Sequence, residues 1–255
     1  MIPSLHLITN DRVLALPRFP AMAGEVLEAG GRRICLHIRG PGSGGRVLWE
    51  RTLALRPEAL RCRSLLVVND RVDVACLLGL DGVHLPERGL PVPLTRKLMG
   101  PSRIVGRSMH DPLALPDEER PDYILAGTLY PTPSHPGRVG AGPGRISQIR
   151  RLNPGVPVVG IGGISLDRVE PVMRAGAYGV ALLRAVWDHT HPGRAVEAYL
   201  ELIRKDALAN RTRPSGPASD LETSAEVTGS HQASGGDGLA GTDAREADPE
   251  TTEAP

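Results

Sequence analysis

Eight short, almost wholly apolar runs recur along the chain, each followed by a segment that is apolar on one side or rich in loop residues. The runs lie at residues 5–9, 34–38, 64–68, 82–85, 103–106, 122–127, 157–161 and 179–183. Short runs that are apolar throughout are typical of strands buried on both faces. Eight parallel strands alternating with helices close into a barrel. The sequence therefore predicts an α/β fold with a single (β/α)8 barrel of the TIM type.

The segments between the runs predict the helices of that barrel. Helices are expected at residues 22–29, 47–55, 72–78, 166–175 and 195–205. Glycines follow three of them, at Gly30, Gly79 and Gly176, and the second helix is placed before Pro57. Residues 112–119 hold Pro112 and Pro116, so this segment is expected to be short or irregular. One barrel domain over residues 1–205 accounts for all of these elements.

The composition agrees with a barrel and excludes several classes of protein. Apolar residues make up 40% of the chain but aromatic residues only 3%, so the core must be aliphatic and few rings can stack on nucleic-acid bases. No apolar run approaches the length of a membrane span. The three cysteines are odd in number and lack CxxC spacing, which argues against a disulfide framework and a structural zinc site. With no basic leader before an apolar stretch, we expect a cytoplasmic protein.

Residues 206–255 have a different composition from the barrel. Gly, Ser, Thr, Ala and acidic residues dominate, and large apolar side chains are almost absent. Such a segment cannot offset its ordering entropy by burial, so we expect a disordered tail. The tail is acidic and the remainder is basic, although the whole chain has a net charge of only +1. A basic body suits phosphorylated small molecules, and binding to nucleic acid is not expected.

The active site of such a barrel lies at the carboxyl ends of its strands. After the seventh run comes IGGIS, in which Gly162 and Gly163 precede a helix. Glycines let backbone N–H groups approach an anion, and a helix N-terminus favours negative charge. The loops after strands seven and eight are the usual phosphate site of such barrels, although a plain tight turn is the alternative.

Charged and polar residues follow the second and third runs. Arg39 suits two-pronged recognition of a phosphate, with a salt bridge at the rim as the alternative. Asn69 and Asp70 offer oxygen atoms that suit Mg²⁺. Asp70 could equally cap the helix that begins at residue 72, and the sequence leaves both interpretations open.

Histidines and one long loop complete the expected mouth of the barrel. The histidines match no metal-binding motif, and each alone is more often structural than catalytic; they are His37, His84, His110 and His135. The loop at residues 131–144 is rich in Pro and Gly. It is either a lid over a bound phosphate or a flexible surface loop.

Taken in order, these segments resemble the thiamine phosphate synthase/TenI family, from about residue 5 to residue 203. The resemblance rests on LHLITN, CLHIRG, VVNDRVDVACLLGLDGVHLPE, IVGRSMH, DYILAGTLYPTPS, PVVGIGGIS and AGAYGVALLRAV. The synthases of this family join an aminopyrimidine diphosphate to a thiazole phosphate and release pyrophosphate. The TenI proteins instead act on a thiazole phosphate as aromatising tautomerases.

The resemblance implies two groups of binding residues. The positions that would contact the pyrimidine diphosphate or its Mg²⁺ are Arg39, Asn69, Asp70 and Ser108. The positions that would contact the thiazole phosphate are Thr132, Ser134, Gly162 and Gly163, with backbone offered by Leu183 and Arg184. Mg²⁺ is implied only for the synthase reaction.

One polar and three charged residues of the synthases are replaced in this chain. A Gln and a Lys fall at His37 and Pro41, a second Mg²⁺ carboxylate falls at Gly89, and a further Lys falls at His135. These losses remove charge that would hold and neutralise a leaving pyrophosphate. The histidine of the tautomerases falls at Thr128, so a proton shuttle would need a substitute.

We therefore predict a thiamine-biosynthesis enzyme that binds a phosphorylated thiazole, and we favour the TenI-like interpretation over a divergent synthase. The candidate catalytic residues are His37, Ser108, His110 and His135. A barrel that binds the ligand without turnover is the third hypothesis. Whether identical chains assemble into an oligomer is left open.

Overall fold

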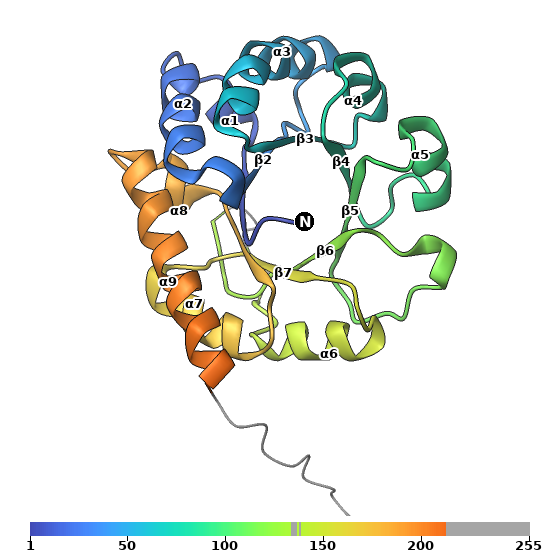
Figure 1. Cartoon of the computed structure of the whole chain (residues 1–255), viewed down its shortest axis with the longest axis vertical. Coiled ribbons are helices and arrows are strands. Elements are labelled where there is room, and N and C mark those ends of the chain that lie inside the picture. Colours follow the sequence, from blue (N-terminus) through green and yellow to red (C-terminus); the bar gives the residue numbers. More distant parts are fainter. Residues whose placement is uncertain (134–136, 138, 213–255) are drawn as a thin grey trace, which may run out of the picture. The chain divides into compact units, whose positions relative to one another are not determined.

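Eight parallel strands form a closed barrel in which each strand pairs with its neighbours in sequence and β8 pairs with β1. The computed structural model describes residues 1–133, 137 and 139–212. Figure 1 looks down the ring of strands and shows the helices outside it. The strands are β1 (Leu5–Ile8), β2 (Ile34–Ile38), β3 (Leu65–Asn69), β4 (Gly82–Leu85), β5 (Ile104–Met109), β6 (Tyr123–Ala126), β7 (Val158–Ile161) and β8 (Gly179–Leu182). The predicted (β/α)8 barrel is confirmed, with every strand at or within its predicted run except β5, which runs three residues further, and β3, which extends one residue.

The helices form the outer layer of the barrel. They are α1 (Asp11–Leu14), α2 (Phe19–Gly30), the 3-10 turn η1 (Gly31–Arg33), α3 (Gly45–Cys62), α4 (Val72–Leu78), α5 (Val92–Met99), the 3-10 turn η2 (Asp117–Glu119), α6 (Gly144–Leu152), α7 (Leu166–Arg174), α8 (Arg184–Trp187) and α9 (Pro192–Thr212). Within the described part of the chain, no helix combines the length and the apolar character that crossing a membrane requires.

The ends of the helices agree with the prediction at some points and differ at others. α4 has its predicted bounds, because Gly79 takes the left-handed conformation that ends it. α3 does not stop before Pro57 but runs through it to Cys62, a correction to the prediction. The buried residues Leu55 and Ala59 anchor the helix on both sides of the exposed proline, and this packing outweighs the local cost. Residues 213–255 lie outside the described residues, so the expected disorder of the tail stays a prediction.

The last helix of the barrel is longer than the helix predicted at residues 195–205. α9 continues to Thr212 rather than ending at Lys205. Its buried side chains include Val196, Leu200 and Ile203, which join the main core. The helix therefore packs along the barrel, chiefly beside α2 and α7.

Successive side chains of each strand point alternately outward and inward, so the strands contribute to two separate hydrophobic cores. One core lies between the strands and the helices and holds, for example, Leu7 and Leu36. The other fills the inside of the barrel and is made of Ile8, Tyr123, Leu125, Val159 and Ala181, with Ile2, Ile104 and Ile161 packed against it. Because side chains alternate along a strand, the residues next to the outward-facing leucines face inward. His6 and His37 are two of these inward residues, and both are fully buried.

Candidate active site

A cavity of about 1100 Å³ opens at the carboxyl ends of the strands. Its wall includes most of the residues that the sequence proposed, and these are Arg39, Asn69, Asp70, Ser108, His110, Thr132, Gly162, Gly163, Leu183 and Arg184. They come from loops that are far apart in sequence and that the closed barrel brings to one end.

Three candidates are not seen in the wall of the cavity. His37 is fully buried inside the barrel and is absent from the cavity lining. Its Nδ1 atom reaches Asn69 at 3.1 Å, and Asn69 does line the cavity. Ser134 and His135 lie outside the described residues.

Arg39 differs from the other two arginines in the cavity wall. Arg71 is paired with Asp73, and Arg184 lies 2.8 Å from Asp188. Within residues 1–133, 137 and 139–212, the guanidinium of Arg39 has no ion pair and no hydrogen bond, so the salt bridge at the rim is not seen. Partial burial lowers the pKa of Arg39, and the nearby Asp11 opposes that shift. A partly buried cation without a counter-ion is suited to bind an anion.

Asp70 differs in the same way from the other acidic residues of the cavity. Its backbone has a positive φ of 57°, and its N–H donates to the carbonyl of His84 at 2.9 Å. The N-cap position of α4 is Arg71, so the carboxylate of Asp70 does not cap that helix. The other three carboxylates in the wall, Glu87, Asp167 and Asp188, all have partners.

The carboxylate of Asp70 has no hydrogen bond or ion pair among the residues that the structure describes. Together with the amide of Asn69, it supplies hard oxygen atoms at the rim of β3. Mg²⁺ typically binds one or two protein carboxylates and completes its shell with phosphate oxygens and water. The donor set therefore fits Mg²⁺ in the company of a diphosphate.

Glu87 is a feature of the cavity that the sequence comparison overlooked. It lies two positions before Gly89, where the family's second Mg²⁺ carboxylate falls. Its carboxylate accepts hydrogen bonds from the backbone N–H of His110 at 2.9 Å and from the ring at 2.8 Å. Burial opposes ionisation of Glu87, but these hydrogen bonds outweigh it and lower its pKa. Glu87 thus fixes His110 in the wall and keeps a negative charge near it.

The IGGIS turn has the backbone geometry that an anion site requires. Gly162 and Gly163 have positive φ values of 104° and 63°. A Cβ atom at Gly162 would lie 2.6 Å from Thr128, and one at Gly163 would lie 2.7 Å from the carbonyl of Pro131. Within the described part of the chain, the N–H of Gly163 donates no hydrogen bond, and the turn leads directly into α7. Only glycine fits here, and its N–H stays available to a ligand.

A buried polar cluster lies directly beneath the cavity. Ser108 lies in the wall and contacts Nε2 of His84 at 2.9 Å, and Nδ1 of His84 contacts the hydroxyl of Tyr123 at 3.1 Å. Burial lowers the pKa of His84 to about 3 and that of His6 to about 4, so both rings are neutral near pH 7. Tyr123 has room because a Cβ at Gly106 would overlap its ring.

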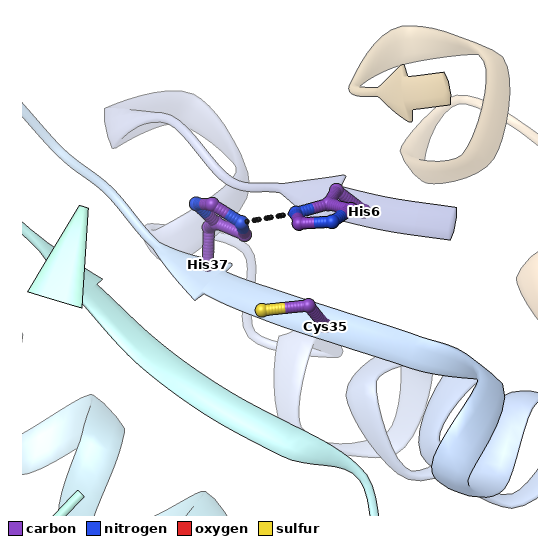
Figure 2. Close-up of side chains that lie close together, drawn as sticks. All are labelled: His6, Cys35 and His37. Carbon is purple, nitrogen blue, oxygen red and sulfur yellow. Dashed lines mark hydrogen bonds between the residues drawn. The ribbon is translucent and has the colours of Figure 1, made fainter. Parts of the chain in front are cut away.

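His6, Cys35 and His37 form the one group of three potential metal ligands found among the described residues, with ligand atoms within 4.8 Å of one another. Figure 2 shows the two imidazoles facing each other from neighbouring strands, with the sulfur of Cys35 to one side. The facing nitrogens, Nδ1 of His6 and Nε2 of His37, lie 2.9 Å apart in a hydrogen bond. A proton therefore lies between the two nitrogens, and the group belongs to the polar cluster.

The chain matches one protein family over most of the barrel. The model of the family described as "Thiamine monophosphate synthase" matches residues 5–186. A thiamine-phosphate synthase of Synechocystis is 35% identical over 204 residues, which are 79% of this chain and 57% of that protein. A thiamine-phosphate synthase of Chlorobium limicola is 34% identical over 83% of this chain and 100% of its own length. The chain thus spans little more than half of the first relative and all of the second.

A solved structure gives the same result. The thiamine phosphate pyrophosphorylase of Pyrococcus furiosus is 29% identical, with a TM-score of 0.66 over 80% of this chain and 96% of that one. The two curated relatives carry the name of thiamine-phosphate synthases, so they do not support the preference for a tautomerase that the sequence suggested.

Proposed function

We infer that this chain, which belongs to the thiamine monophosphate synthase family, joins an aminopyrimidine diphosphate to a thiazole phosphate and releases pyrophosphate. The observation that carries the proposal is a pair of opposite charges in one cavity, Arg39 and Asp70, neither of which has a side-chain partner among the described residues. They follow β2 and β3, whereas the glycine turn follows β7, on the other side of an eight-stranded ring. This separation would allow each of two anionic substrates its own subsite.

The diphosphate subsite is proposed at the ends of β2, β3 and β5. Arg39 would bind the diphosphate as a bidentate cation, and the hydroxyl of Ser108 would contact one of its oxygens. Asn69 and Asp70 would hold Mg²⁺. When bound, this ion would stabilise the negative charge that develops on the leaving diphosphate. These residues would orient the diphosphate within the cavity.

The thiazole phosphate subsite is proposed at the IGGIS turn. The N–H of Gly163 and the N-terminus of α7 would bind the phosphate, and Thr132 lies in the same wall. Leu183 and Arg184 follow β8 beside the turn and would add backbone contacts. The side chain of Arg184 is held by Asp188, so its role is assigned to the backbone.

A synthase is favoured over a tautomerase by the position that the tautomerases fill with histidine. Thr128 occupies that position and lines the cavity, and a hydroxyl is a poor proton shuttle near pH 7. Two histidines lie in the described wall. Nδ1 of His110 is held by Glu87, and both ring nitrogens of His84 have partners, Tyr123 and Ser108. Arg39 and Mg²⁺ would neutralise the negative charge of the leaving pyrophosphate in place of the missing lysines.

The test is an assay of the purified chain with both substrates and Mg²⁺. We expect thiamine phosphate and pyrophosphate to form in equal amounts, and chelation of Mg²⁺ to stop the reaction. The absence of turnover, with thiazole phosphate still bound, would contradict the proposal. Conversion of the unaromatised thiazole phosphate in the same preparation would then establish the tautomerase.

A further inference from the structure

The buried rings beneath the cavity form a continuous series of polar contacts from one end of the barrel to the other. At the amino-terminal end, Nε2 of His6 lies 3.1 Å from the carbonyl oxygen of Pro3. At the cavity end, the chain divides toward Asn69 and Ser108. The ring centroids of neighbouring members lie 4.8–6.2 Å apart. The carbonyl oxygen of Pro3 can act only as an acceptor. This fixes the position of each proton along the series of buried rings.

The Pro3 carbonyl can only accept, so Nε2 of His6 carries the hydrogen. His6 is neutral near pH 7, which leaves its Nδ1 as an acceptor. The Nε2 atom of His37 lies 2.9 Å from that Nδ1 and must therefore donate. His37 is also fully buried, and among the described residues its ring nitrogens contact only His6, Asn69 and Tyr123, none of which is a carboxylate. A buried ring without a counter-charge is neutral, so its own Nδ1 carries no hydrogen.

The direction of the chain then decides how the amide of Asn69 lies. The bare Nδ1 of His37 needs a donor, but the Oδ1 atom of Asn69 faces it at 3.1 Å. Two acceptors cannot share that contact. A turn of the amide by 180°, which exchanges its oxygen and nitrogen, gives the contact a donor. The oxygen of Asn69 then faces the cavity.

The same direction decides the other branch. Since Nε2 of His37 donates to His6, it cannot accept from Tyr123, and its distance to the Tyr123 hydroxyl is the longest in the chain, 3.5 Å. Tyr123 therefore donates to Nδ1 of His84 at 3.1 Å. His84 then carries its hydrogen on Nε2 and donates to Ser108. The hydrogen of the Ser108 hydroxyl is left to point into the cavity.

We propose that His6, His37, Tyr123 and His84 are positioning residues that fix the polarity of the cavity floor, so that Ser108 donates and Asn69 accepts. A donor suits a diphosphate oxygen, and an acceptor suits Mg²⁺. The assignment of these two groups to a diphosphate rests on the proposed function, whereas the direction of the chain does not.

The buried rings could also be hydrogen-bonded in the opposite sense, with each donor and acceptor exchanged. His6 excludes that arrangement. Without an acceptor at residue 6, Nε2 of His37 is free to accept from Tyr123, and Nδ1 of His37 then donates to the oxygen of Asn69. Tyr123 in turn accepts from Nδ1 of His84, and Ser108 donates to Nε2 of His84. In this state the hydroxyl hydrogen of Ser108 turns away from the ligand. His6 therefore acts as a switch for two groups that it does not touch.

The direct test is nitrogen NMR of the imidazole rings in the full chain at pH 7, which distinguishes protonated from bare ring nitrogens. The wild-type protein is expected to carry hydrogen on Nε2 of His6, His37 and His84. His6→Asn keeps an acceptor and should leave His84 unchanged, whereas His6→Phe should move the hydrogen of His84 to Nδ1. The double variant with Tyr123→Phe breaks the link and should prevent that move. Hydrogen on Nδ1 of His84 in the wild-type protein would overturn the proposal even if His6→Phe fails to fold.

A binding experiment tests the consequence at the cavity. Inorganic pyrophosphate with Mg²⁺ should bind about tenfold more weakly to His6→Phe than to wild type, as expected for the loss of one hydrogen bond to a charged group. His6→Asn should bind as the wild type does. Equal binding of pyrophosphate by all three proteins would contradict the proposal that the buried rings set the direction of the Ser108 hydroxyl. If the wild-type protein does not bind pyrophosphate, the proposed function fails, and the NMR result decides the direction of the chain separately.

Discussion

At the scale of single residues, the polar interior of the barrel depends on the missing side chain of Gly106. A Cβ atom there would overlap the ring of Tyr123. We predict that Gly106→Ala lowers the free energy of unfolding by about 1–3 kcal/mol, because an extra methyl group in a packed core forces its neighbours to move. Urea unfolding of the two proteins measures this difference.

Gly24→Ala is the matched control for Gly106→Ala. Gly24 lies inside α2, and a Cβ atom there would meet nothing within 4 Å. Alanine has a higher helix propensity than glycine, so this variant should gain about 0.5–1 kcal/mol. A Gly106→Ala protein as stable as the wild type would show that the Tyr123 ring is not confined as the structure has it.

Which site residues could be predicted depends on whether they adjoin the ends of the strands. Arg39 and Asp70 immediately follow strands, and the rule that a barrel binds at its carboxyl end was enough to place them. His6 and Tyr123 lie inside the barrel, and their contacts join residues far apart in sequence. The sequence could have indicated them only through the alternation of side chains along a strand, which places both residues on the inner face of the barrel. Glu87 was visible after its strand, but its pairing with His110 depends on how two loops meet.

At the scale of the elements, helices with a clear glycine stop were predicted well and polar helices were missed. α4 ends at Gly79 as expected. α5 begins beside prolines and α6 is rich in arginine, and each buries only two side chains. Their few buried residues are enough because the barrel supplies the apolar surface against which they pack.

α3 provides a prediction at this scale, because it contains an exposed proline in its interior. Pro57 lacks the N–H of a helical hydrogen bond, and its ring crowds the preceding turn. We expect Pro57→Ala to stabilise the protein by about 2 kcal/mol, after allowance for the greater freedom of its unfolded chain. Arg56→Ala, at the neighbouring exposed position, should change stability by less than about 0.5 kcal/mol. Similar unfolding curves for the two variants would mean that the helix accommodates Pro57 without cost.

At the scale of the whole molecule, the buried histidines make stability depend on pH. The folded protein holds His6 and His84 neutral, with pKa values of about 4 and about 3, whereas both ordinarily titrate near 6.5. Between these values the unfolded chain binds more protons than the folded one, so the folded state loses stability as the pH falls from 6.5. Each such histidine should cost about 1.4 kcal/mol per pH unit.

The measurement is urea unfolding at pH 7, 6 and 5, above the range in which most carboxylates titrate. His6→Asn removes one titrating ring and should make the dependence on pH less steep. A free energy of unfolding that stays constant from pH 7 to 5 would show that the interior rings are protonated or accessible to solvent.

Asp70 is proposed to hold Mg²⁺ beside the leaving diphosphate, and the most direct measurement compares pyrophosphate release by Asp70→Asn and Asp73→Asn. Asp73 is a nearby exposed carboxylate that pairs with Arg71 and is absent from the cavity lining. We predict that Asp70→Asn lowers kcat/KM by at least about 100-fold, because a metal clamp contributes several kcal/mol to such a transition state. Asp73→Asn should stay close to the wild type. Equal activity of the two variants would contradict the account.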